Sequence, residues 1–479
     1  MKLIFEKSVK GRHTDILPSP KSNAGKWLPK NLLNEELPDL PELSELDVVR
    51  HFTELSRRNA GVDTAFYPLG SCTMKYNPKV NEAIASNQQF TNIHPLSPDL
   101  SHQGTLHFMY DFSKLLSELC GMAEFSLHPM AGAHGEFAGL AMIKAYHASM
   151  QDTKRTAALV PDSSHGTNLA TASMAGYKVK NIKSREDGEV DIEDLKKHLG
   201  DDTAVLMLTN PSTLGLFETQ ILEIADIVHS AGGLLYYDGA NMNAIAGKVR
   251  PGDMGFDVVH LNIHKTFSAP HGGGGPGCGA VGVSERIVPF LPNPRVVKND
   301  DGIFSWSSDF PNSIGRVSGF YGNVLVALKG YLYLRSLGAS GIREMSEHAV
   351  LAANYLRVKQ AKHFPAAKDR FCMHEFVAQP SPELRNHRIR AMDIAKCLID
   401  RGIHPPTVYF PLIVQEALMI EPTETESLQT LDDFIEVMNS IAGQCLSNPE
   451  SAFAAPEHMP VTRLDEAKAA RELKLVYKQ

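Results

Sequence analysis

The chain has 479 residues, of which 43% are hydrophobic and 21% are charged, and its formal net charge is −8. This balance is typical of a folded globular protein and excludes an intrinsically disordered chain. The mild acidity, with a pI near 6.2, argues against general binding of nucleic acid or of an anionic membrane surface.

The first part of the chain, residues 1–90, is predicted to be an arm followed by a helical segment. Prolines interrupt residues 1–42 repeatedly, so we expect an arm there, which could be disordered or could wrap a neighbouring subunit. A helix is predicted over 45–59, because Ser44 and Asp47 form a capping-box pattern before an apolar face. The stretch 66–78, FYPLGSCTMKYNP, has no periodicity and is predicted to be a structured loop.

Residues 91–330 alternate between short apolar runs and amphipathic segments. Helices are predicted from about 105 to Gly121, from near Gly135, and around 192–199 and 221–228. Strands are predicted at 156–161, 177–182, 203–209, 233–238, 257–263 and 279–283. Strands this apolar, separated by helices, indicate an α/β domain with a mostly parallel sheet that helices cover on both faces.

Residues 331–479 have a different pattern and are predicted to form a smaller α+β domain. Long helical patterns at 343–363, 387–401 and 427–446 accompany strand candidates at 371–378 and 417–421. No stretch is apolar for the roughly 20 residues that a membrane span needs. The N-terminus lacks a signal-peptide core, and the six cysteines are widely spaced, which favours a reducing, cytoplasmic location.

The segment 257–279, DVVHLNIHKTFSAPHGGGGPGCG, is the most informative for function. Its strand ends at His264 and Lys265, and a glycine-rich loop follows. Ligands of open α/β sheets bind at the carboxyl ends of the strands, and a lysine there can form a Schiff base with an aldehyde cofactor. An isolated lysine after a strand is more often a surface residue. The glycines match neither G-x-x-x-x-G-K-[ST] nor G-x-G-x-x-G after a strand, so a nucleotide loop is not indicated.

Three further segments contain candidate site residues. Asp238 ends an apolar strand and could pair with a protonated pyridine nitrogen, although a turn or capping role is the alternative. The small residues before the helix near Gly135, within HPMAGAHGEFAGL, could bind phosphate at a helix N-terminus or simply form a tight loop. His165 follows another strand and could lie flat against a cofactor ring or be a solvated loop histidine.

The order of these features is more specific than any one of them. A phosphate-type loop, a histidine, an aspartate at a strand end and a lysine at a later strand end all fall in one α/β domain. This is the arrangement of a pyridoxal-phosphate site in the aspartate-aminotransferase fold. The histidines and cysteines form no clear metal-binding spacing, so we expect no metal site.

Six motifs together resemble those of the glycine dehydrogenase (decarboxylating) family, the P-protein of the glycine cleavage system. They are FYPLGSCTMKYNP, PMAGAHGEFAGL, PDSSHGTNLATA, LTNPSTLGLFE, YYDGANMNAI and LNIHKTFSAPHGGGGPGCG. The match runs from about 60 to 420. The length fits only the half of the long single-chain form that carries the cofactor lysine, so the chain resembles subunit 2 of the split, two-subunit bacterial type.

The resemblance implies a pyridoxal-phosphate-dependent transferase of fold type I and a role for each motif residue. Lys265 would form the Schiff base with pyridoxal 5'-phosphate, Asp238 would pair with the pyridine nitrogen, and His165 would stack on the ring. The other cofactor-binding residues implied by the resemblance are Ala133 and His134 near the phosphate, Thr213 near the phenolic oxygen, and His264.

The activity that the resemblance implies is decarboxylation of glycine, with transfer of the aminomethyl group to the lipoyl group of H-protein and release of CO2. The implied partners are lipoylated H-protein and a homologous subunit 1, in a heterotetramer with two copies of each subunit. Two alternatives remain. One is another amino-acid decarboxylase of the same cofactor class, and the other is a non-catalytic scaffold subunit of such a complex.

Overall fold

The computed structural model describes residues 1–14, 24–34, 36, 38–272 and 277–476. These residues form two compact units, Met1–Thr64 and Ala65–Gln479, which are described separately. Parts of the predicted arm (15–23, 35 and 37) and of the predicted glycine-rich loop (273–276) lie outside the described residues.

The described residues of the first unit have little secondary structure before the helix α1. It contains three short 3-10 helices, Phe5–Lys7, Ala24–Lys26 and Lys30–Leu32, followed by α1, Glu45–Ser56. The predicted capping box of Ser44 and Asp47 is confirmed, but α1 ends three residues before the predicted boundary. None of the described hydrophobic side chains in this unit is buried. The apolar side of α1 is therefore exposed, with Leu46, Val49 and Phe52 each more than half accessible.

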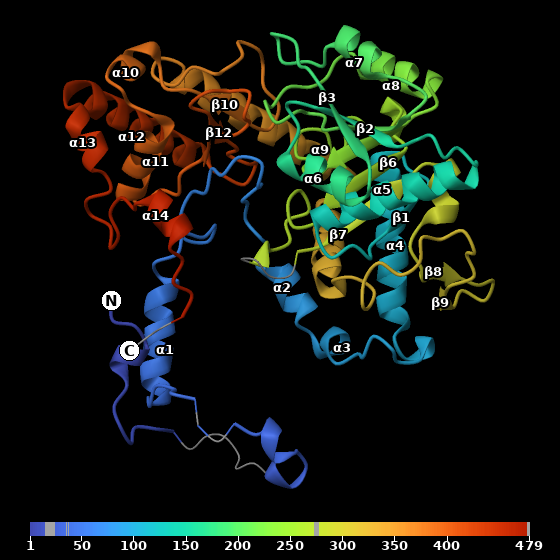
Figure 1. Cartoon of the computed structure of the whole chain (residues 1–479), viewed down its shortest axis with the longest axis horizontal. Helices are drawn as coiled ribbons and strands as arrows, with labels where there is room; N and C mark the ends of the chain where they lie inside the picture. Colours follow the sequence, from blue (N-terminus) through green and yellow to red (C-terminus); the bar gives the residue numbers. More distant parts are fainter. Residues whose placement is uncertain (15–23, 35, 37, 273–276, 477–479) are drawn as a thin grey trace. The chain divides into compact units, whose positions relative to one another are not determined.

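A seven-stranded sheet is the centre of the second unit, with strand order β1-β7-β6-β5-β4-β2-β3 (Figure 1). Strands β2 to β6 run parallel, and β7 and β1 add an antiparallel edge. The strands are β1 Glu124–Ser126, β2 Ala157–Pro161, β3 Lys178–Ile182, β4 Thr203–Leu208, β5 Leu234–Gly239, β6 Val258–Asn262 and β7 Gly279–Val283. In β2, β4, β5, β6 and β7 every residue is buried, which is why the sequence shows apolar runs rather than alternation.

Helices cover both faces of this sheet. Alternation along β5 sends Tyr237 into a core shared with α4 and α8, whereas Tyr236 packs in a second core with α5. The surrounding helices are α4 Gln103–Cys120, α5 Gly132–Ser149, α6 Gly166–Met174, α7 Ile192–His198 and α8 Ile221–Ser230. The mostly parallel, helix-covered sheet is thus confirmed, while the short strands β1, β8 (Arg295–Lys298) and β9 (Phe304–Ser307) were not predicted.

The C-terminal part is an antiparallel three-stranded sheet, order β10-β12-β11, packed against helices with its own core. The predicted helix at 343–363 is the second half of the long helix α9, which begins at Val324 and is interrupted at Gly338. The domain boundary that the sequence places at 330 falls within α9 and stays a prediction. These elements are α9 Val324–Gln360, β10 Phe376–Ala378, α10 Pro382–Asn386, α11 Ala391–Asp400, β11 Thr407–Val408, β12 Leu418–Ile420, α12 Leu428–Ser447, α13 Pro449–Ala454 and α14 Glu466–Arg471.

The remaining elements are short and connect the larger ones. They are α2 Lys79–Ala85, α3 Gln88–Thr91 and the 3-10 helices Asp99–Ser101, Pro251–Met254 and Glu285–Phe290. The predicted loop at 66–78 is confirmed; one isolated bridge joins it, through Leu69, to Ile420 of β12. No helix among the described residues is long and apolar enough to cross a membrane.

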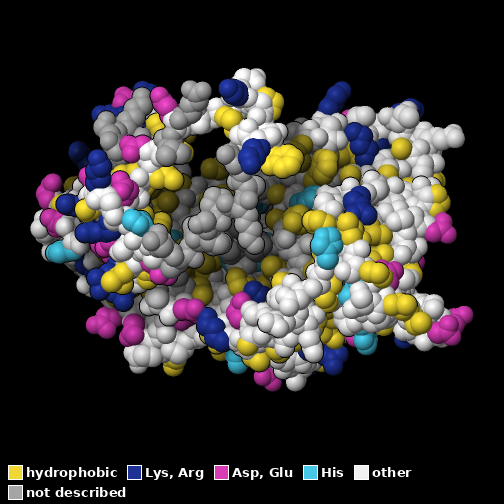
Figure 2. Space-filling model, turned by 90° about the horizontal axis from the view of Figure 1, so that it is seen from below, with side chains coloured by type: hydrophobic (Ala, Val, Ile, Leu, Met, Phe, Trp, Pro, Cys, Tyr) yellow, Lys and Arg dark blue, Asp and Glu magenta, His cyan; other side chains and the backbone are white. Residues whose placement is uncertain are grey.

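The surface in Figure 2 mixes side chains of opposite charge. Lysine and arginine side chains are scattered among acidic and apolar ones over the coloured part of that face. That face therefore presents mixed charge rather than an extended basic patch in its described part.

Candidate active site

A cavity of about 260 Å³ lies at the carboxyl ends of the central strands. Segments that follow β2, β4, β5 and β6 contribute to it, together with the start of α5 and the turn before β10. Its lining residues are Ser71, Gly132, Ala133, Glu136, His165, Thr167, Thr209, Pro211, Ser212, Thr213, Asp238, Ala240, Asn241, His260, Asn262, His264, Lys265, His374 and Glu375. This is where ligands of open α/β sheets bind.

Lys265 lines the cavity from the turn directly after β6. Its backbone N–H donates to the carbonyl of Asn262 at 3.0 Å, which fixes the turn. Within the described part of the chain no carboxylate lies within ion-pair distance of its amine. Lys265 is half-buried and borders the cavity.

Asp238 is buried at the end of β5 and is held as a carboxylate by three neighbours. Asn168 donates to its Oδ2 at 2.9 Å, and the N–H of Ala240 donates to its Oδ1 at 3.1 Å. His260 faces it from β6, with 3.5 Å between Nε2 and Oδ1. Burial opposes ionisation, but the attraction of His260 and these hydrogen bonds outweigh it and keep the pKa of Asp238 below its ordinary value.

His165 and Thr213 line the cavity from two loops. His165 is the N-cap of α6, where its Nδ1 accepts from the Thr167 N–H at 3.2 Å. Burial lowers the pKa of His165, so its ring is neutral near pH 7. The Thr213 hydroxyl donates to the carbonyl of Ser163 at 2.5 Å, which joins the loop after β4 to the loop after β2.

The start of α5 is shaped to admit an anion. No side chain caps this helix, so its first amides face the cavity beside Gly132 and Ala133. Gly132 is required because an added Cβ would collide with the side chain of Asn262. His134 is placed differently: its ring turns back and accepts from the N–H of Met130 at 3.1 Å, and it is not among the cavity-lining side chains.

His264 packs against the described end of the glycine-rich loop. Its Nδ1 lies 3.2 Å from both the N–H and the carbonyl of Cys278, and its ring meets His271 edge-on at 5.0 Å. Burial, aided by the nearby charges of His271 and Lys265, lowers the pKa of His264 to about 4. A neutral imidazole therefore lies beside the reactive amine.

The sequence did not reveal Glu136 as a member of the site. It is buried in the first turns of α5, where the Thr167 hydroxyl donates to its Oε1 at 2.8 Å. Burial and the negative charge of Asp238 raise the pKa of Glu136 to about 7. Its sequence signal was an acidic residue near the start of a helix, which favourable interaction with the helix N-terminus explains equally well.

Glu375, which lines the cavity from the C-terminal part, forms a second acidic pair with Glu421. The N–H of Ser71 donates to Glu375 at 2.7 Å, whereas Glu421 accepts from the Thr73 N–H at 2.9 Å, the Thr73 hydroxyl at 2.7 Å and Asn241 at 2.8 Å. Burial and the charge of Glu421 raise the pKa of Glu375 to about 8. At neutral pH Glu375 is protonated, whereas the three donors to Glu421 oppose the rise that burial causes in the pKa of Glu421.

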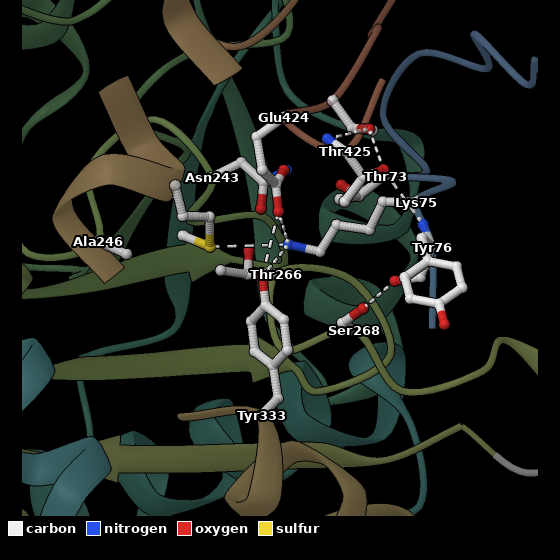
Figure 3. A network of polar contacts seen from close by, with 12 residues as sticks. Thr73, Lys75, Tyr76, Asn243, Ala246, Thr266, Ser268, Tyr333, Glu424 and Thr425 are labelled. Atoms are coloured by element: carbon white, nitrogen blue, oxygen red, sulfur yellow. Dashed lines mark hydrogen bonds and ion pairs between the residues drawn. The ribbon is translucent and has the colours of Figure 1, made fainter. Parts of the chain in front are cut away.

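The loop that donates to this pair is itself fixed by a buried ion pair (Figure 3). The Lys75 amine lies 2.6 Å from Glu424 and 3.2 Å from the hydroxyl of Tyr333, and Tyr333 donates to Glu424 at 3.1 Å. Burial alone would lower the pKa of Lys75, but the charge of Glu424 outweighs it and raises that pKa. The network connects the 66–78 loop, α9 and the segment after β12.

Two groups of buried side chains bring three potential metal ligands within 4.8 Å: Glu136, Asp238 and His260, and His374, Glu375 and Glu421. Protein donors already occupy both oxygens of Asp238 and of Glu421. The carboxylates of Asp238 and Glu421 are therefore already held by the protein, whereas Oε2 of Glu136, Nε2 of His260 and both nitrogens of His374 have no hydrogen-bond partner among the described residues.

These residues fit pyridoxal phosphate. Four groups border one cavity: the amine of Lys265, the buried and ionised carboxylate of Asp238, the neutral ring of His165 and the uncapped start of α5. Together with the sheet they define the class: a pyridoxal-phosphate-dependent enzyme of fold type I.

Comparison with known proteins places the chain more narrowly. The family model of the glycine cleavage system P-protein matches residues 21–301, and that of the glycine dehydrogenase C-terminal domain matches 345–458. A probable glycine dehydrogenase (decarboxylating) subunit 2 of Treponema denticola is 57% identical over 99% of this chain and 98% of its own length. A protein of the same description from Listeria innocua is 54% identical over 100% and 98%. The chain belongs to the glycine cleavage system P-protein family.

Solved structures confirm the fold. A crystal structure of glycine decarboxylase (P-protein) in inhibitor-bound form superposes with a TM-score of 0.72 at 21% identity, covering 87% of this chain and 94% of that one. A cysteine desulfurase from Thermococcus onnurineus superposes with a TM-score of 0.58 at 15% identity, covering 80% and 95%.

Proposed function

We propose that this chain is the cofactor-bearing subunit of a glycine decarboxylase of the glycine cleavage system. It takes glycine, releases CO2 and transfers the aminomethyl group to the lipoyl group of H-protein. One observation carries the proposal. In this member of the family, Lys265, the ionised carboxylate of Asp238 and the uncapped start of α5 all border the same cavity.

The cavity residues would hold pyridoxal phosphate in a defined orientation. Lys265 would bind it covalently through its amine, Asp238 would face the pyridine nitrogen, and the first amides of α5 would bind the phosphate. His165 would lie against the ring, Thr213 near its phenolic oxygen and His264 near the phosphate. Ala133 would approach the phosphate through its backbone, as would His134, whose ring points elsewhere.

When bound, this group supplies an electron sink for the pair left on the α-carbon as CO2 departs. The chain contributes the conditions for that chemistry. Asp238 stays ionised because Asn168, Ala240 and His260 hold it, so a proton on the facing nitrogen is stabilised. His165 and His264 are neutral, so they add no positive charge that would compete with this proton for the carboxylate of Asp238.

The transfer step requires partners that the cavity alone does not supply. We propose that lipoylated H-protein delivers the disulfide that receives the aminomethyl group. We further propose a companion subunit 1, with two copies of each subunit, because the relatives that span this whole chain are described as subunit 2. A decarboxylase that merely reprotonated its product would need no such acceptor.

Replacement of Lys265 tests the assignment. After borohydride reduction of the wild-type protein, we expect the cofactor to remain attached to the peptide that contains residue 265. Lys265→Ala should retain none, whereas the control Lys196→Ala, on the surface of α7, should retain the wild-type amount. Mass spectrometry of the digested protein gives the result. Wild-type attachment in the Lys265→Ala protein would refute the role of this lysine.

A further inference from the structure

The side chain of His374 borders the cavity without a partner. It lies in the turn before β10 and is only 3% exposed, yet neither ring nitrogen has a hydrogen-bond partner among the described residues. The closest acidic atom is Oε1 of Glu375, 3.8 Å from Nε2. A buried polar group in this state costs free energy, which a bound ligand group would recover.

The other histidines of the cavity already have partners. His165 is bonded to Thr167, His264 to Cys278 and His260 to the hydroxyl of Tyr236. Those rings are fixed by the protein, whereas both nitrogens of His374 remain available. Of the described imidazoles that line the cavity, His374 is therefore the one with neither nitrogen bonded; Nε2 of His260 is also unpartnered, but it faces Asp238 at 3.5 Å.

The cavity also lacks the usual partner for a carboxylate. No arginine is among its described lining residues, and Lys265 is occupied by its role toward the cofactor. An amino-acid substrate still brings a carboxylate that needs a donor once it leaves water. Glu375 does not repel it, because that carboxyl is protonated at neutral pH.

Resting on the proposed function, we propose that the imidazole N–H of His374 donates a hydrogen bond to the carboxylate of the bound glycine. Burial lowers the pKa of His374 to about 3, so the donor is uncharged. This suits decarboxylation, since a charged partner would stabilise the carboxylate that the reaction must discharge as neutral CO2. A neutral donor orients the group without holding it so strongly.

A comparison of two amines tests this step without turnover. Glycine and methylamine should both react with the cofactor of the holoenzyme and change its visible absorbance, but only glycine has a carboxylate. With no disulfide acceptor present, titration gives an apparent Kd for each amine. We expect His374→Ala to raise the Kd for glycine roughly ten- to a hundredfold, as loss of a hydrogen bond to a charged group does, and to leave that for methylamine within twofold.

Two further variants make the test decisive. His374→Asn retains an N–H donor and should recover part of the glycine affinity. It also provides a second variant to measure if His374→Ala folds poorly. His363→Ala removes a histidine whose Nδ1 likewise lacks a partner but which lies outside the cavity lining, and it should change neither Kd. If His374→Ala raised the Kd for both amines equally, or left the Kd for glycine unchanged, the inference would be overturned. Failure of the wild-type protein to respond to either amine would instead refute the proposed function, and the inference with it.

Discussion

Two buried carboxyl groups near the cavity differ in the number of hydrogen bonds that they accept. Glu421 receives three hydrogen bonds, two from Thr73 and one from Asn241, and these favour its ionised form. Glu375 receives one, from Ser71, and lies next to that negative charge. Burial and the charge of Glu421 place the pKa of Glu375 near 8, so the folded protein binds a proton there that the unfolded chain releases near pH 4.5.

The proton on Glu375 makes stability depend on pH. Between about pH 5 and 8 the folded state binds more protons than the unfolded state, so the free energy of unfolding should fall as the pH rises and level off above pH 8. Glu375→Gln cannot ionise and should flatten this decline. Urea titrations of cofactor-free protein across that range measure it. The control Glu383→Gln alters an exposed carboxyl and should follow the wild-type curve, and an equally steep decline in Glu375→Gln would contradict the assignment.

Sequence reasoning found the residues that follow strands and missed those that arrive from elsewhere. Ala133, His165, Thr213, Asp238, His264 and Lys265 all border the cavity, because their loops meet at one edge of the sheet. His374 and Glu375 come from the turn before β10, a strand of the separate C-terminal sheet, and no local pattern relates them to Lys265. The chemical roles of all these residues remain predictions.

At the scale of elements, apolar runs identified strands well and helix ends poorly. The buried strands β2, β4, β5 and β6 were found because uninterrupted burial gives uninterrupted apolar sequence. β8 and β9 have only four residues each, too few for a pattern. The start of α9 was missed because the conformation of Gly338 divides the helix, and only its second half had a clear period.

The ion pair of Lys75 and Glu424 gives the 66–78 loop its fixed position. Lys75→Met should lower the free energy of unfolding by about 3–5 kcal/mol, because the variant leaves Glu424 charged and buried without its cation. It should also weaken glycine binding, since the same loop supplies the donors Ser71 and Thr73. Urea denaturation and the glycine titration described above measure the two effects.

A matched surface pair controls for loss of a lysine. Lys196 lies 3.0 Å from Glu193, and the two side chains are 47% and 74% exposed. Lys196→Met should cost no more than about 1 kcal/mol. If the free energy of unfolding fell by a similar amount in the two variants, burial of the Lys75 pair would contribute nothing to stability beyond what a surface pair contributes.

At the scale of the whole molecule, the exposed face of α1 matters for assembly. Val49 and Phe52 are 54% and 55% exposed within a unit that buries none of its described hydrophobic side chains. Permanent interfaces are apolar and large, so we expect this face to contact the companion subunit. Phe52→Glu should reduce co-purification of the two subunits at least tenfold, as measured by size-exclusion chromatography with light scattering.

A second surface substitution separates this effect from a general change in solubility. Leu222 on α8 is 62% exposed, and Leu222→Glu adds the same charge elsewhere. It should leave the complex intact. Normal assembly of the Phe52→Glu protein would exclude α1 from the interface.

The hydrogen bonds that complete the cavity also set an order for its formation during synthesis. Ser71 and Thr73 are translated early, but their acceptors Glu375 and Glu421 follow 304 and 348 residues later. The segments that we propose to hold the cofactor, up to Lys265, leave the ribosome well before either acceptor does. A nascent chain can therefore fold its central sheet first, while the substrate-facing wall must wait until almost the entire polypeptide has emerged. If the proposed function holds, we expect the nascent chain to become able to bind the cofactor before it can recognise the amino acid.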